Sequence, residues 1–158
     1  MHDKLLEYLR KELTRNLEER HIKVSGLLGG TFGETVALFM LNHQLGLPQD
    51  DAERFLDETL DEIHHNCLMS TYCNGLAGIG IGLILLNEKD FIELEAEALN
   101  NFDAYLSRAM ASFTAQGNFD LLHGATGIAL YFTKRSDTAI ETSREALTAY
   151  ITSIKKHW

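Results

Sequence analysis

Three stretches of this chain follow one pattern: SGLLGGTFGETVALFM at 25–40, STYCNGLAGIGIGLIL at 70–85 and NFDLLHGATGIALYFT at 118–133. Each contains a Gly-x-x-Gly step followed by an apolar run. The glycine pairs are Gly30 and Gly33, Gly75 and Gly78, and Gly124 and Gly127. Their first members are 45 and 49 residues apart. A period of this length is typical of an array of repeated supersecondary units.

The segments between these stretches have apolar residues at helical spacing with charges around them, which predicts amphipathic helices with one buried face. The stripes are Leu5–Leu9–Leu13–Leu17, Phe55–Leu56–Leu60–Ile63, Phe91–Leu94–Leu99–Phe102–Leu106–Phe113 and Ile140–Leu147–Ile151–Ile154. The Gly-x-x-Gly stretches carry almost no charge, which predicts helices buried on most sides. The order is therefore outer, inner, outer, inner, outer, inner, outer.

An inner ring of near-neutral helices covered by amphipathic ones is an all-α, α/α-toroid arrangement. Two glycines three residues apart share a helix face and let a neighbouring backbone come close. An α-solenoid of the HEAT or armadillo type has a similar period, but its helices lack the Gly-x-x-Gly opening. The sequence predicts one partial toroid domain over residues 1–158, with three helical hairpins plus one helix and inner-helix starts near residues 30, 75 and 124. Such a chain is a fragment or pairs with another chain at its open edge.

The chain of 158 residues has a formal net charge of −9. This balance argues against nucleic acid and anionic membranes as partners, because both need a basic surface. The uncharged stretch 67–87 has a compact apolar part of only about 12 residues, which is too short for a membrane span. Two cysteines and an N-terminus without a signal-peptide core indicate a reducing compartment, the cytoplasm.

The residues of two repeats are specific enough to be compared with a known family. Gly-Leu-Ala-Gly-Ile-Gly after a Ser-x-Tyr start, and Phe-Asp-Leu-Leu-His-Gly-Ala-Thr-Gly-Ile-Ala-Leu-Tyr-Phe, resemble the lanthionine synthetase C-like family. Complete members are α/α toroids of seven such hairpins. The resemblance implies enzymes of lantibiotic biosynthesis that use zinc to add peptide cysteine thiols to dehydrated Ser or Thr, forming thioether rings. It covers the family's first three inner helices only.

The departures from the family bear on the metal. The family holds zinc through a Cys-Tyr-Gly-like segment and a Cys-His-Gly segment in later repeats, and neither occurs here. The segment most similar to Cys-His-Gly is Leu122-His123-Gly124, with leucine in place of cysteine. Asp120 matches the third-repeat aspartate that the family uses in cyclisation. The resemblance thus implies zinc for complete members, no metal site in this chain, and a chain that is not catalytic alone.

Four residues are candidates for the site. Asp120 precedes an inner helix and could steer or carry a proton, or simply cap the helix. His123 could carry a proton, or pack at the helix start. Glu34 is the only charge that the three quoted stretches place on an inner helix, and it either lines a cavity or faces solvent at the first turn. Tyr72, together with Phe32, Phe119 and Tyr131, lines a peptide-binding cup or belongs to the core; the core interpretation is favoured.

Two further groups have metal-ligand chemistry. Cys67 and Cys73 are six residues apart, wider than the usual spacing of a zinc pair, and small buried residues are the simpler interpretation. Asp61, His64 and His65 lie at helical spacing on an acidic helix, where a solvated face is favoured. We therefore predict no metal site from either group.

Three functions remain open. The first is the N-terminal part of a lanthionine synthetase C-like protein, with a peptide substrate and the rest of the toroid as partners. The second is a peptide- or protein-binding helical-repeat module that dimerises through its open edge. The third is a carbohydrate-active toroid, which needs two facing carboxylates, here Glu34 and Asp120.

Overall fold

The computed structural model describes residues 2–20, 25–65 and 69–157. This part of the chain contains helices and no strand. Seven of the helices are α-helices and one is a short 3₁₀-helix. They are α1 (His2–Glu19), α2 (Thr31–Leu45), α3 (Asp50–His65), α4 (Leu76–Glu88), η1 (Ala96–Leu99), α5 (Asn100–Ala115), α6 (Ala125–Arg135) and α7 (Ile140–His157). The all-α prediction is confirmed.

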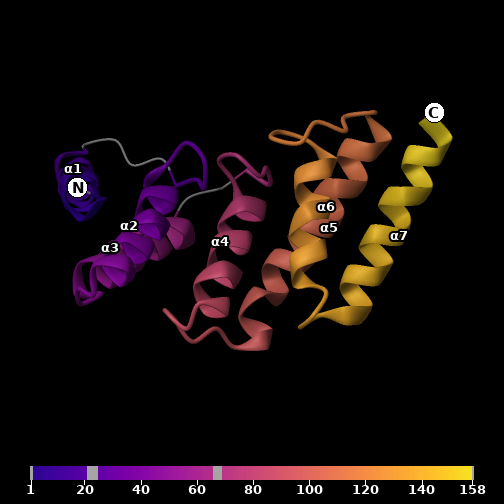
Figure 1. The fold of residues 1–158 in the computed structure, drawn as a ribbon. Helices are drawn as coiled ribbons and strands as arrows, with labels where there is room; N and C mark the ends of the chain where they lie inside the picture. Colours follow the sequence, from indigo (N-terminus) through magenta and orange to yellow (C-terminus); the bar gives the residue numbers. More distant parts are fainter. Residues whose placement is uncertain (1, 21–24, 66–68, 158) are drawn as a thin grey trace.

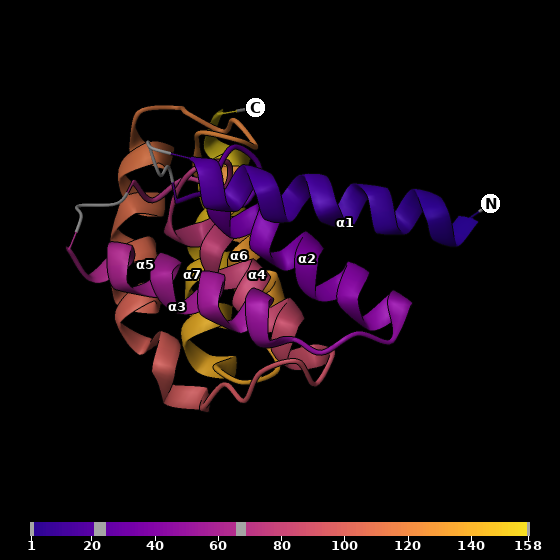
Figure 2. The same cartoon turned by 90° about the vertical axis from the view of Figure 1, so that its left-hand side faces the viewer.

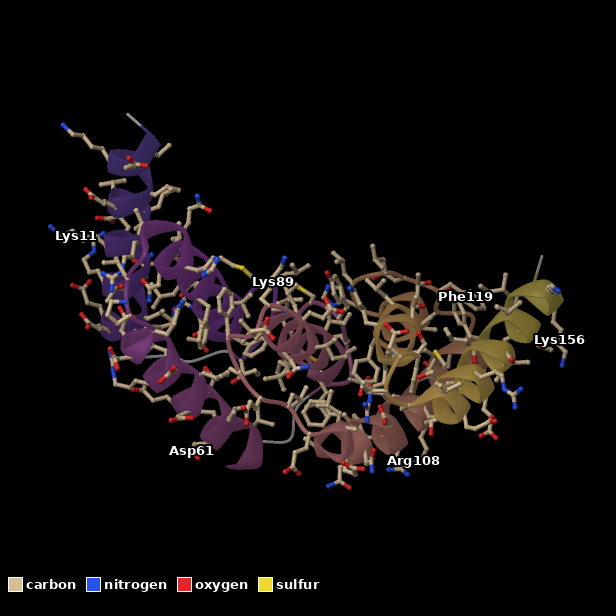
Figure 3. The ribbon with its side chains drawn as sticks, turned by 60° about the horizontal axis from the view of Figure 1, so that its bottom comes forward. Lys11, Asp61, Lys89, Arg108, Phe119 and Lys156 are labelled. Carbon is tan, nitrogen blue, oxygen red and sulfur yellow. The ribbon has the colours of Figure 1, made fainter. Side chains whose placement is uncertain are left out.

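The helices follow one another along a curved row, in which α3 packs with α2 and α5 packs with α6 (Figure 1). The three Gly-x-x-Gly helices pack against one another in chain order, α2 on α4 and α4 on α6. Helices α1 and α3 pack on α2, while α5 and α7 pack on α6 and on each other. Seen from a third direction, the row bends into an open arc (Figure 3). The alternation of inner and outer helices agrees with the predicted one, and closure of such an arc into a toroid stays a prediction.

Burial follows the charge pattern of the sequence. Helix α4 is apolar nearly all round and is buried along most of its length, whereas α3 buries one stripe and exposes its acidic face. The inner helices begin at Thr31, Leu76 and Ala125, as the glycine pattern predicts. Each is preceded by an N-cap glycine in extended conformation, which has no side chain to cap the helix. Loop carbonyls take over this role: the Leu76 and Ala125 N–H groups donate to the residues seven positions earlier.

The second glycine of each pair is required by a contact within its own repeat. A Cβ atom there would lie 1.9–2.2 Å from the carbonyl oxygen of the residue six positions earlier. The pairs are Gly33 with Leu27, Gly78 with Tyr72, and Gly127 with Leu121. The prediction of a close backbone approach is confirmed, but the backbone is that of the preceding loop and not that of the neighbouring inner helix.

Two glycines that the repeat pattern did not single out make the contacts between inner helices. A Cβ atom at Gly80 would lie 2.5 Å from the ring of Tyr131 on α6. One at Gly82 would lie 2.3 Å from the ring of Phe32 on α2. Both rings are fully buried. The core interpretation of Phe32 and Tyr131 is therefore confirmed. The two glycines of α4 leave room for these aromatic rings on its two neighbours.

The third outer helix is shorter than its apolar stripe predicts. Residues 91–95 are not helical, and α5 begins only at Asn100. Phe91 stacks on Phe39 of α2, with ring centroids 5.7 Å apart, and the Leu94 N–H donates to the side chain of Asn87. These contacts hold the segment across the ends of α2 and α4. None of the helices described is both long and apolar enough to cross a bilayer.

Candidate functional site

The loops that precede the inner helices lie along one edge of the row, at the top of Figure 1. Two hydrogen bonds join them. The Leu28 N–H donates to the Cys73 carbonyl at 3.0 Å, and the Cys73 N–H donates to the Leu122 carbonyl at 3.1 Å. Each of these residues stands two positions before its N-cap glycine. We call this set of equivalent residues, Leu28, Cys73 and Leu122, the loop ladder.

Asp120 lies at the C-terminal end of the loop ladder. Its Oδ1 accepts the N–H of Leu122 at 2.8 Å and the N–H of His123 at 2.6 Å. The Asp120 N–H in turn donates to the side chain of Asn118 at 3.1 Å. These bonds fix the orientation of the carboxylate at the start of α6, where the side chain remains exposed to solvent.

The equivalent position in the preceding repeat clarifies what these bonds do. Thr71 stands four residues before Gly75, as Asp120 does before Gly124, and its hydroxyl accepts the Asn74 N–H at 3.5 Å. Asp120 and Thr71 thus share a turn-forming role. The structure gives Asp120 the capping contacts of the structural interpretation and also leaves it accessible, so both interpretations of this residue stand.

His123 and Tyr72 lie on either side of the same contact between loops. The His123 side chain is exposed, and its backbone carbonyl accepts a bond of 3.3 Å from Asn118. Tyr72 is half-buried, and its Cβ lies 2.5 Å from the position that a Cβ of Gly127 would occupy. The loop ladder therefore brings the Tyr72 loop against the loop that carries Asp120 and His123.

Glu34 lies in the first turn of α2, where its side chain is partly exposed and paired. Its carboxylate pairs with the Arg20 guanidinium, with Nη2 and Oε1 2.6 Å apart. The second oxygen, Oε2, is buried and accepts no hydrogen bond from the described residues. The side chain is only a quarter exposed. Glu34 joins the end of α1 to the first turn of α2, where a carboxylate also complements the helix dipole.

The side chains with metal-ligand chemistry do not gather. Within the described residues, no three His, Cys, Asp or Glu side chains come together as they would around a metal ion. The Cys73 thiol is half-buried and lies 3.5 Å from the Asn74 side-chain oxygen. Cys67 and the side chains of His64 and His65 lie outside the described residues, and Asp61 is exposed on α3.

A buried polar cluster that the sequence analysis missed joins α5, η1 and α6. Arg135 and Asp103 form an ion pair with Nη2 and Oδ2 3.1 Å apart, and both are almost fully buried. Arg135 also donates to the Ala96 carbonyl at 2.6 Å and to the Asn100 side chain at 3.2 Å. The Tyr131 hydroxyl donates to Asp103. The signal lay in the stripe Leu99–Asp103–Leu106–Met110, in which an aspartate occupies a core position.

This cluster makes the stability of the chain depend on pH at the alkaline end. Burial, and next the hydrogen bond to the Asp103 carboxylate, raise the pKa of the Tyr131 hydroxyl above its usual value of about 10. The unfolded chain releases this proton near pH ~10 while the folded chain keeps it, so stability falls as pH rises above that value. The limiting contribution is about 1.4 kcal/mol per pH unit.

The Tyr131→Phe variant isolates that contribution. We expect urea unfolding at about pH 9 and about pH 11 to show a smaller loss of stability in the variant than in the wild type, because only the wild type carries the buried hydroxyl. Equal losses in the two proteins would mean that Tyr131 does not titrate on unfolding.

Comparison with known proteins adds no match: no family model, curated protein or solved structure is similar to this chain at a significant level. The candidate site is a ladder of three equivalent loops with one oriented, accessible carboxylate at its end.

Proposed function

We propose that this chain supplies the N-terminal repeats of a lanthionine synthetase C-like protein, whose complete members form thioether rings in peptides. The loop ladder carries the proposal. Three Gly-x-x-Gly helices start at one edge of the array, their loops stand in register, and Asp120 lies at the rim beside the last of them. Its position matches the aspartate that the resemblance assigns to cyclisation.

The chemistry of thiol addition gives Asp120 a role. The thiol gives up its proton and its sulfur bonds to the β-carbon of a dehydrated residue, while the C=C π bond breaks and a proton is added at the α-carbon. A carboxyl group that is exposed and held in one orientation can carry that proton. The bonds from the Leu122 and His123 N–H groups occupy Oδ1 and orient the carboxylate. No step is assigned to zinc, because the resemblance places the segments that would hold it in later repeats.

The proposal is tested on the product of the whole reading frame. We expect the frame to continue past Trp158 with Cys-Tyr-Gly-like and Cys-His-Gly segments. The encoded protein should protect the thiols of a dehydrated, cysteine-containing peptide from alkylation, measured by mass spectrometry. Asp120→Asn should lower the rate of this protection about 100-fold, the lower end of what a general acid or base contributes.

The asparagine variant keeps an Oδ1 acceptor for the two turn bonds, so the fold should be unchanged. Asp50→Asn, on the exposed acidic face of α3, is the matched control and should retain the wild-type rate. A frame that stops at Trp158, or an Asp120→Asn protein with unaltered cyclisation, would remove the proposal. Residues 1–158 alone should leave the peptide thiols free. The proposed location of the reaction is the cytoplasm.

A second function, a peptide- or protein-binding repeat module, is favoured by the C-terminal edge of the array. Leu27 packs against α4 and Tyr72 packs against α6, so each contacts the inner helix of the following repeat. The equivalent residue in the third repeat, Leu121, is 47% exposed, and its neighbour Leu122 is 38% exposed. This edge thus presents an apolar surface of the kind that the earlier repeats bury, and it suits a further repeat, a peptide or a second chain.

A further inference from the structure

Helix α1 projects from the body of the molecule (Figure 2). Its first half presents an apolar stripe to solvent. Leu5, Tyr8 and Leu9 are 55%, 59% and 43% exposed. Their i, i+3, i+4 spacing places them on one face of the helix. Contiguous apolar residues on a projecting helix are characteristic of a surface that another protein covers.

The second half of α1 is fixed to the body. Leu17 is buried, and Arg10 forms an ion pair with Asp51 of α3 and donates to the Asn42 side chain of α2 at 2.6 Å. These contacts hold the axis of α1 in place. The exposed stripe therefore keeps a fixed position on the molecule.

An apolar groove of about 390 Å³ opens on the outer side of the same molecule. It lies where α3 and α5 separate above α4, and η1 closes its other side. Two exposed carboxylates, Asp57 of α3 and Glu93, stand among its lining residues. The apolar lining is Leu56, Leu60, Ile63, Leu83, Ile92, Leu94, Ala98, Leu99 and Phe102. The groove thus combines an apolar floor with an acidic rim.

Two lysines border the stripe on α1, with Glu7 between them on the same side of the helix. Lys4 and Lys11 flank it, seven residues or about 10 Å apart along the helix. Both lysines are exposed, and neither is joined to an acidic side chain in the described part of the chain. A helix that places an apolar face in a groove and its flanking charges on the opposite rim is a common mode of recognition.

We propose that the stripe Leu5–Tyr8–Leu9 of one copy of this chain docks in the α3–α4–α5 groove of a second copy, with Lys4 and Lys11 facing Asp57 and Glu93. The exchange is reciprocal, so that the dimer has two-fold symmetry and two identical contacts. This dimer differs from one formed through the open edge at Leu121, and it does not depend on the proposed enzymatic function.

Sedimentation velocity on the full chain tests the dimer. We expect wild type to pass from monomer to dimer as its concentration rises. Leu9→Glu should weaken the association at least about tenfold, because a carboxylate replaces an apolar contact. Ile151→Glu on α7 is the matched control: its side chain is 50% exposed but lies outside the proposed contact, so this variant should dimerise as wild type does. A wild type that stays monomeric, or equal effects of the two variants, would overturn the proposal.

Charge reversal identifies the groove as the receptor. Lys4→Glu/Lys11→Glu and Asp57→Lys/Glu93→Lys should each weaken self-association about tenfold, since each places like charges face to face. A mixture of the two proteins pairs opposite charges at both contacts, so it should form a heterodimer at wild-type strength. Failure of the mixture to associate, while each variant remains folded by circular dichroism, would show that α1 does not dock in this groove.

Discussion

Gly78→Ala is expected to lower the free energy of unfolding by about 3 kcal/mol or more. A Cβ atom at this position would lie 2.0 Å from the Tyr72 carbonyl oxygen and 3.0 Å from the Leu27 Cβ. Alanine favours a helix over glycine by about 1 kcal/mol, which acts in the opposite direction. We expect the steric overlap to dominate, because the Tyr72 loop is held on both sides by the loop ladder and cannot retreat.

Urea unfolding monitored by circular dichroism measures this effect. Gly29→Ala is the matched control in the equivalent loop of the first repeat. Gly29 is exposed, and the atom nearest to its added Cβ is the Asn74 side-chain oxygen, which can rotate away. We expect a change within about 1 kcal/mol for the control. Similar losses in the two variants would show that the loop yields and that the glycine is not required for packing.

Asp103→Leu is expected to cost about 3–5 kcal/mol of stability, because it leaves the Arg135 guanidinium buried without its counter-ion. The same change removes the acceptor of the Tyr131 hydroxyl. Both partners of the pair are almost completely shielded from water, so little solvent is available to replace the carboxylate.

Two comparisons define the origin of that loss. Glu141→Leu breaks the exposed pair with Arg144 on α7 and should change stability by less than about 1 kcal/mol. Asp103→Leu/Arg135→Met removes both buried charges and should recover part of the stability lost in the single variant. Equal losses for Asp103→Leu and Glu141→Leu would contradict the assignment of the buried pair as a stabilising contact of the fold.

The sequence was sufficient to predict the inner helices. Charge-free stretches with a glycine step mark their positions, and both signals are local. The prediction that the third outer helix includes Phe91 and Leu94 was wrong for a physical reason. The apolar spacing of these two residues also suits an irregular segment that packs on α2 and α4. Asp90 adopts a positive φ of 58° just before it, and no residue type in this stretch forbids helix.

The candidate site was predictable only in part. The position of Asp120 before an inner helix followed from the repeat. Its partners did not, because a hydrogen bond between Cys73 and Leu122 joins loops that are far apart in sequence and depends on their backbone angles. The pairing of Glu34 with Arg20 was equally hidden, since nothing in the local pattern places the end of α1 against the start of α2.

The loop ladder has a direction, and its last step differs from the others. The Cys73 N–H donates to the Leu122 carbonyl of the next repeat, so the Thr71 hydroxyl accepts only the Asn74 N–H. At the end of the array the Asp120 carboxylate accepts both equivalent N–H groups. If a further repeat followed, one of its loop carbonyls would accept the Leu122 N–H in the same way. Asp120 would then lose one of its two hydrogen bonds, so the number of repeats in the array would set how firmly the carboxylate at its rim is held in one orientation.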